Sequence, residues 1–278
     1  MTYVLSKFPN FAHAEFISFG AYMTYALLMY FGLPLVPAVF ISGLLSALLG
    51  GVSYLLLFKP LLRRGASLIH LMVASIGLGL IIRHCLMEIF GGDILSFRIF
   101  WPTLHLRISL LGYDLGSLST TPLWLSLIAF SALFSLSLHI FFTKTAFGKA
   151  IRATADNPEL AMASGINTES VILFTWCLGA SLAGLAGTFL AIGTALVPLL
   201  GWKMLLPAFS VTVFGGIGSF YGALLASYIL GFAESIGVVL LTNLGLSADY
   251  RTAISFAVLI ITLIVRPSGI AGLTHRRA

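Results

Sequence analysis

The feature that most constrains this chain is a series of long, continuous apolar segments. Each is close to the roughly 20 residues that an α-helix needs to cross a bilayer. In hydrocarbon every backbone N–H and C=O must be paired within the protein, so only α-helices and closed β-barrels can span it. Barrel strands alternate apolar and polar side chains over about ten residues, unlike these runs. The sequence therefore predicts an all-α, polytopic membrane protein.

The composition agrees with this fold class. Hydrophobic residues make up 59% of the 278 and charged residues only 9%, against roughly a quarter charged in soluble domains. Cys85 and Cys177 lie far apart in apolar runs, which argues against a disulfide framework or a thiolate metal site. The net charge of +6 is not gathered in a basic patch with interleaved aromatic residues, so we expect no nucleic-acid partner and no metal.

We predict about seven or eight membrane segments within a single domain, 1–278. The segment at 203–214 is too short to span alone and is expected to be a partial or strongly tilted helix. The predicted segments are 17–33, 35–58, 68–90, 122–142, 169–196, 203–214, 222–240 and 250–266.

Basic residues indicate the orientation, because cytoplasmic loops carry an excess of Lys and Arg. Three clusters follow the second, fourth and last segments: Lys59, Arg63 and Arg64; Lys144, Lys149 and Arg152; Arg266, Arg276 and Arg277. Placing all three inside gives a multi-pass protein of the cell (inner or plasma) membrane with a cytoplasmic C-terminus. The loop 91–121 then lies outside. Its alternating leucines and isoleucine from Leu104 to Leu110 predict a short strand or hairpin.

The cytoplasmic stretch 143–169, TKTAFGKAIRATADNPELAMASGINTE, carries helix signals of its own. A run of helix formers covers 149–155. Asp156 or Asn157 can cap a second helix, and Pro158 suits its first turn because the missing N–H has no partner there.

Further signals extend this pattern. Glu159, three residues after Asp156, resembles the acidic position of a capping box. Gly165 suits the left-handed position after a helix, and Asn167 can cap the following membrane helix. Two short helices beneath the membrane, with small residues and both charge signs, would suit a docking surface. An ordinary amphipathic connector at the headgroups is the alternative.

Four stretches together resemble a known family. The stretch 143–169 looks like the coupling segment of ATP-binding-cassette (ABC) importer permeases, in particular the branched-chain amino-acid (hydrophobic amino acid uptake) family. NFAHAEFISFGAY at 10–22, FGGIGSFYGALLASYILGFAES at 214–235 and RPSGIAG at 266–272 resemble that family's other motifs, in its order. Its members usually have one more helix before the NFAHG-type motif. Met1 to Val4 fall where that helix would be ending, so the first family helix is expected to be missing or truncated.

The resemblance implies partners. These are two cytoplasmic ATPase subunits, a second permease as homo- or heterodimer, an extracytoplasmic substrate-binding protein and the lipid bilayer. The ATPases would dock on the segment between Gly148 and Gly165, specifically on Gly148, Lys149, Arg152, Ala153, Asp156, Asn157, Pro158, Glu159, Ala161 and Gly165. The chain has no GxxxxGK[ST] phosphate loop, since its one Gly-Lys, at 148–149, is followed by Ala. We therefore expect no cofactor in this chain and ATP on the partner subunits.

Some polar residues at membrane depth are candidates for a translocation path. Asn10, His13 and Glu15 cluster before the first long apolar run, and Glu234 lies deep in 222–240. Intramembrane ionisable groups are functional candidates. The alternatives are a polar boundary for the first three and a subunit contact for Glu234.

Two further groups have structural explanations. His84 and Glu88 share a helix face with Arg83 adjacent, which could be a proton relay or a local charge pair at the outer interface. The glycines Gly215, Gly216 and Gly218 fail the GxGxxG spacing because position 221 is Tyr. They predict a tight turn between helices.

The sequence thus predicts a permease subunit that is not itself an enzyme. HExxH, GxSxG and a paired-carboxylate constellation at membrane depth are missing from it. The resemblance implies branched-chain or related amino acids as substrate, with urea, short amides or sugars as alternatives. A secondary transporter driven by an ion gradient is a further alternative, with Glu234 as its ionisable candidate.

Overall fold

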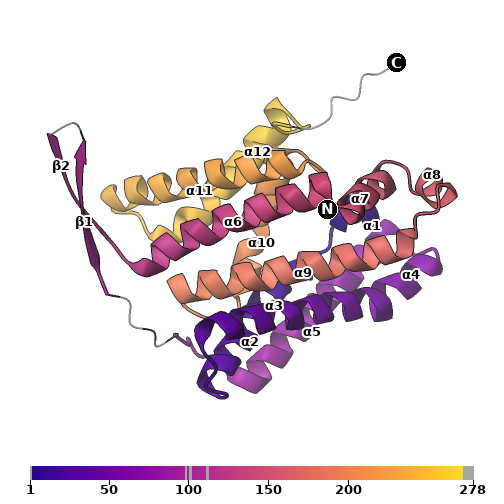
Figure 1. Ribbon diagram of the computed structural model, residues 1–278, viewed down its shortest axis with the longest axis horizontal. Helices are drawn as coiled ribbons and strands as arrows, with labels where there is room; N and C mark the ends of the chain where they lie inside the picture. The colour runs from indigo at the N-terminus through magenta and orange to yellow at the C-terminus, as the bar shows by residue number, and fades with distance from the viewer. Residues whose placement is uncertain (1, 98, 100–101, 111–112, 272–278) are drawn as a thin grey trace.

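The computed structural model describes residues 2–97, 99, 102–110 and 113–271. Arg276 and Arg277, which the orientation argument used, lie outside them. Figure 1 shows long helices with a β-hairpin at one end. The elements are α1 (Thr2–Ser6), α2 (His13–Met29), α3 (Leu35–Ser53), a π-helix η1 (Tyr54–Phe58), α4 (Lys59–Arg63), α5 (Leu68–Phe90), β1 (Leu104–Leu110), β2 (Tyr113–Thr120), α6 (Pro122–Lys144), α7 (Ala146–Asp156), α8 (Pro158–Ala163), α9 (Thr168–Gly193), α10 (Leu200–Gly215), α11 (Phe220–Asn243), a 3₁₀ turn η2 (Ala248–Tyr250) and α12 (Arg251–Val265).

Five helices are long and apolar enough to cross a membrane: 35–63, 68–90, 122–144, 168–193 and 220–243. The first joins α3, η1 and α4 without interruption, so it runs five residues beyond the predicted end at 58. Two shorter apolar helices, α10 and α12, accompany them. The chain is therefore a multi-pass α-helical membrane protein.

α2 is the central helix of the larger group, which also contains α3, α5 and α9. Its packing depends on small residues: a Cβ on Gly20 would overlap the backbone of Gly184 on α9, and a Cβ on Gly184 would overlap Ser46 on α3. In lipid, helices associate through such close approach because the hydrophobic effect between them is missing. The three helices thus meet at a glycine contact.

A buried polar cluster joins the same three helices. The Thr24 hydroxyl on α2 donates to Ser42 Oγ on α3 at 2.7 Å and lies 2.8 Å from Thr188 Oγ1 on α9. All three side chains are fully buried. Interhelical hydrogen bonds of this kind fix helix register in membranes.

α10, α11 and α12 form a second, smaller group, and α10 links it to α2. Figure 1 shows α10 crossing steeply between the two groups. Ser210 on α10 donates to the carbonyl oxygen of Ser255 on α12 at 2.9 Å. α6 lies beside α11, where Ser131 contacts Tyr228 at 2.9 Å.

The extramembrane elements lie at opposite ends of the helices (Figure 1). β1 and β2 pair antiparallel, with Leu104 opposite Thr120, so the strand or hairpin predicted in 91–121 is confirmed. α4, α7 and α8 lie at the other end. The basic residues of α4 and of α7 therefore lie at the same end of the helices, as the assignment of both to the cytoplasm predicts.

Candidate functional site

The segment 145–167 forms the two helices that the sequence signals indicate, but the capping-box pattern of Asp156 with Glu159 is wrong, because Asp156 is the last residue of α7. The Thr145 hydroxyl caps α7 by accepting from Gly148 N at 3.0 Å. Asn157, rather than Asp156, caps α8 and accepts from Leu160 N at 3.0 Å. Gly165 has φ 82°, and Asn167 caps α9 by accepting from Ser170 N at 3.1 Å. Each of the two short helices therefore begins at a side-chain cap, and a third cap begins the membrane helix α9.

The docking candidates divide between two faces of this segment. Gly148 and Ala161 are buried, as are Ile151 and Thr154. A Cβ on Gly148 would overlap Phe141 of α6, so this glycine seats α7 against the membrane helix. The exposed residues are Lys149, Arg152, Asp156, Asn157, Pro158, Glu159 and Gly165, together with Leu160 and Met162; Ala153 is half-buried. The free face thus carries both charge signs and two apolar side chains.

An ion-pair cluster joins the start of α9 to α4. Glu169 accepts from Lys59 Nζ and, at 3.2 Å, from Arg63 Nη2. Glu169 directly follows the α7–α8 segment in the chain. The contact therefore ties the end of that segment to the helix 35–63.

The N-terminal segment is a helix broken inside the protein. His13, the first residue of α2, lies beside Gly179 of α9. Gly179 is eleven residues into α9, or about 17 Å at 1.5 Å per residue. α2 therefore begins near mid-depth, and 7–12 connect it to α1. Non-helical backbone at this depth occurs only where it is buried in protein or lines a cavity.

Aromatic side chains anchor this connecting segment. Phe8 is buried against Phe58, at 5.2 Å between ring centroids, and against Trp176. Phe58 and Tyr54 come from the π-helix η1, and Trp176 Nε1 donates to Ser6 Oγ at 3.0 Å. π-helical turns are frequent at functional sites. Here the turn places Phe58 against Phe8 and Tyr54 against Trp176.

α10 also begins within the protein, next to the start of α2. Gly201 N donates to Ser18 Oγ at 2.8 Å, and a Cβ on Gly201 would overlap the Ala14 carbonyl oxygen. The N-termini of α2 and α10 thus meet at mid-depth. Short helices that end inside a membrane protein commonly border transport sites.

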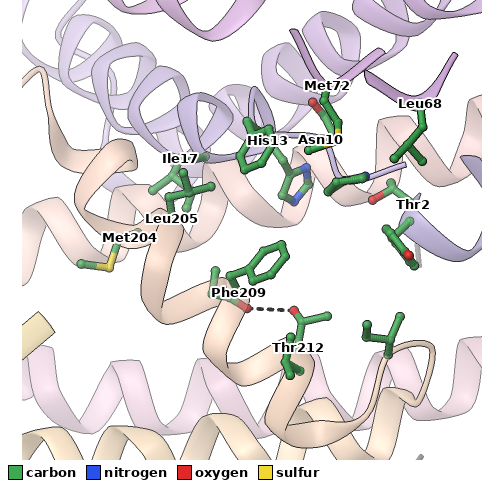
Figure 2. Close-up of a pocket in the computed structure, with 17 residues that line it drawn as sticks. Thr2, Asn10, His13, Ile17, Leu68, Met72, Met204, Leu205, Phe209 and Thr212 are labelled. Carbon is green, nitrogen blue, oxygen red and sulfur yellow. Dashed lines mark hydrogen bonds between the residues drawn. The ribbon is translucent and has the colours of Figure 1, made fainter. Parts of the chain in front are cut away.

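A cavity of about 480 Å³ lies beside this junction. Its walls come from residues 9–17, from the first residues of α5 and from residues 204–213 of α10. Figure 2 shows Asn10, His13 and Ile17 on one side and Phe209 and Thr212 on the other. It is lined by seventeen residues: Thr2, Tyr3, Pro9, Asn10, Phe11, His13, Ala14, Ile17, Leu68, Met72, Met204, Leu205, Ala208, Phe209, Thr212, Val213 and Ile217.

The four path candidates are not brought together. Asn10 and His13 line the cavity, but Glu15 lies behind its wall and is 1% exposed. Glu15 pairs with Arg83 of α5, whose Nε donates to Oε1 at 3.1 Å. The expectation that Arg83 belongs to a local group with His84 and Glu88 was therefore wrong, because its side chain reaches across to α2.

Glu234 lies in the second helical group. It accepts from the Ser255 hydroxyl and is 3.8 Å from Arg251 Nε, both on α12. Its side chain is 16% exposed. The carboxylate thus joins α11 to α12 and does not line the cavity.

The glycine-rich turn links α10 to α11. Gly216 and Gly218 have φ of 97° and 94°, which L side chains rarely adopt. A Cβ on Gly215 would overlap Gly222 and Ala223 of α11. The predicted turn therefore lies at 216–219, with Gly215 as the last residue of α10. Among the described residues no group of three His, Cys, Asp or Glu side chains could hold a metal ion.

Comparison with known proteins decides the family. The family described as "Branched-chain amino acid transport system / permease component" matches residues 1–263. This chain belongs to that family. The probable branched-chain amino acid transport permease protein LivH of Methanocaldococcus jannaschii is 33% identical to this permease over 285 residues, covering 100% of this chain and 87% of the relative.

One further relative matches nearly the whole permease, and another matches less than half of it. The high-affinity branched-chain amino acid transport system permease protein LivH of Escherichia coli K12 is 30% identical, covering 98% of this chain and 88% of the relative. The autoinducer 2 import system permease protein LsrC of Yersinia enterocolitica is 34% identical, but over only 46% of this chain and 38% of its own. No solved structure gives a significant match.

The sequence did not indicate two parts of this permease site: the junction of α2 with α10, and the pairing of Glu15 with Arg83. The available signals were a glycine at 201 near the start of a short apolar run and an arginine within a spanning segment. Neither signal names a partner, because the partners are 183 and 68 residues away.

Proposed function

We propose that this chain is the membrane-spanning permease subunit of an ABC importer and carries branched-chain or related amino acids. The full-length relatives named for branched-chain amino acid transport support this substrate class. ATP would be hydrolysed on separate subunits, in agreement with the missing phosphate loop. The C-terminus and the α7–α8 end would face the cytoplasm, because basic residues gather there.

The observation that carries the proposal is the exposed face of α7–α8. Leu160 and Met162 are 63% and 54% exposed, next to Lys149, Arg152 and Glu159. Apolar side chains surrounded by charges of both signs suit a protein surface better than lipid headgroups. We propose that two ATPase subunits dock here, one on each of two permeases.

The second permease would contact a face that the single chain leaves open. α6 buries only Leu123 and Phe142 along its 23 residues, and α11 only Gly222, Ala226 and Leu230. These faces suit lipid or a second copy or homologue of the chain. With α2, α10 and α12 counted beside the five long helices, we propose eight membrane segments in one domain, and an extracytoplasmic binding protein on the hairpin side.

The test is co-purification in detergent with the cognate ATPase subunits. A Gly-Ser replacement of 149–164 would also remove the buried Ile151 and Thr154, so a smaller change is sharper. We expect Glu159→Lys, and the double variant Leu160→Ser with Met162→Ser, to lose most of the bound ATPase. The matched control is Leu244→Ser with Leu246→Ser, two exposed leucines that follow Asn243, the last residue of α11.

Two results would contradict this function. Equal ATPase recovery with the α8 variant and the control would show that α8 is not the docking surface. If no ATPase bound to the native chain, under conditions that hold a known importer together, the importer function would be contradicted. A gradient-driven carrier would then be the better explanation, with Glu234 as its first ionisable candidate.

A further inference from the structure

The walls of the cavity carry no net charge. Among its seventeen lining residues there is no Asp, Glu, Lys or Arg. The neighbouring charges, Glu15 and Arg83, neutralise one another, and Glu15 is almost completely buried. Transfer of a charged group into such surroundings without a partner is strongly unfavourable. The cavity is therefore unsuited to an inorganic ion or to a substrate with a charged side chain.

Adaptable apolar side chains form most of the surface. Met72, Met204, Leu205 and Phe209 line the cavity together with Ile17 (Figure 2). Methionine is unbranched and polarisable, so it fits apolar groups of different shape. The volume of about 480 Å³ lies in the range of roughly 300–1,000 Å³ found for small-molecule sites. These walls suit aliphatic side chains of more than one shape.

Asn10 lines one side of the cavity, but its side-chain nitrogen is closed off from the open space. Asn10 Oδ1 accepts from Ala12 N at 3.1 Å, while Asn10 Nδ2 is buried with no hydrogen-bond partner among the described residues. The first amides of α2 are engaged: His13 N and Ala14 N donate to the carbonyls of Asn10 and Phe11. Neither the Asn10 side-chain nitrogen nor the His13 and Ala14 amides are thus open to a ligand, and the apolar side chains form the binding surface.

We propose that this cavity receives the apolar side chain of the amino acid in transit. Phe209 with Met72 limits the size of that side chain. The inference rests on the proposed importer function and adds to it the residues that select the substrate. Phe209 and Met72 are specificity-determining residues on this account.

The experiment is uptake into proteoliposomes that contain the complete importer. Leucine and phenylalanine are each supplied at concentrations that saturate the binding protein, so the rates report the permease. Phe209→Ala enlarges the cavity and is expected to raise the ratio of phenylalanine to leucine uptake about tenfold, the lower end of what one methylene contributes to selectivity. Ala208→Phe fills the cavity and is expected to lower leucine uptake about tenfold or more. Ala257→Phe, on an exposed residue of α12 outside the cavity, is the matched control.

The outcomes are distinct. An unchanged uptake ratio in Phe209→Ala, in a complex that still binds its ATPases, overturns the cavity assignment and leaves the importer intact. No ATP-dependent uptake by the native complex overturns the proposed function instead. If Ala208→Phe does not assemble, Phe209→Ala decides, because it only shortens a side chain that is 42% exposed.

Discussion

The guanidinium of Arg83 on α5 lies 4.9 Å from the ring centroid of Trp202 on α10 and donates to Glu15 on α2. One side chain thus contacts both helices that begin at mid-depth. Cation–π contacts of a desolvated guanidinium contribute about 2 kcal/mol. Arg83 therefore stabilises the junction of α2 with α10, which lies beside the cavity.

The first prediction is that Arg83→Met destabilises the protein by about 3–5 kcal/mol, because it leaves the Glu15 carboxylate buried without its cation. Glu15→Gln alone should be destabilising for the converse reason. The double variant, in which both groups are neutral, should regain most of the loss. Thermal unfolding in detergent of the four proteins measures the coupling, and strictly additive effects would show that the two side chains act independently.

The second prediction concerns the contact of α2, α3 and α9. Gly184→Val would force a side chain into the space of Ser46 and Gly20 and is expected to cost about 1–3 kcal/mol or more through overpacking. Gly231→Val on α11 is the control, because a Cβ there has no neighbour within 4 Å. Yield and melting temperature should fall for Gly184→Val alone. Equal losses would mean that helix propensity, not packing, governs both sites.

Local sequence signals were sufficient for much of the fold. The caps at Asn157 and Asn167 were predictable because each side chain bonds its own backbone neighbours. Gly165 was predictable because glycine readily adopts the positive φ that follows a helix. The hairpin at 104–120 followed from period-two alternation. The start of α2 was placed four residues late, at 17, because the prediction began at the first long apolar run, whereas the helix starts among the polar residues at 13.

Long-range pairings were beyond the reach of a single sequence. Arg83 has His84 and Glu88 as sequence neighbours, and nothing local shows that its side chain turns toward Glu15. The same holds for Ser18, whose hydroxyl accepts from Gly201 N. Helix packing decides these contacts. It also places Asn10 and His13 in the cavity wall, Glu15 in the buried pair with Arg83, and Glu234 in the α11–α12 contact.

The third prediction is that Asn157→Ala weakens ATPase binding, whereas Asn157→Asp does not. The Asn157 side chain caps α8, and loss of such a cap costs about 1 kcal/mol. Asp keeps the capping oxygen. If the ordered α8 is the docking helix, ATPase recovery should fall about fivefold, which corresponds to that free energy. Equal loss with Asp would indicate that the Asn157 amide contacts the partner directly.

The last prediction separates ATPase docking from the transmission of its movement. Glu169 joins the start of α9 to Lys59 and Arg63 at the end of the helix 35–63, while the exposed docking residues lie before it in the chain. Glu169→Gln should therefore leave ATPase recovery unchanged and lower the amino acid taken up per ATP hydrolysed. Because Glu169 is solvent-exposed and exposed pairs are screened by salt, raising the salt concentration should weaken the native protein's coupling toward that of the variant.

Glu159→Gln, on the docking face, should show the opposite pattern, with reduced ATPase recovery and unchanged uptake per ATP in the complexes that form. If both variants lose ATPase to the same extent, Glu169 belongs to the docking surface itself.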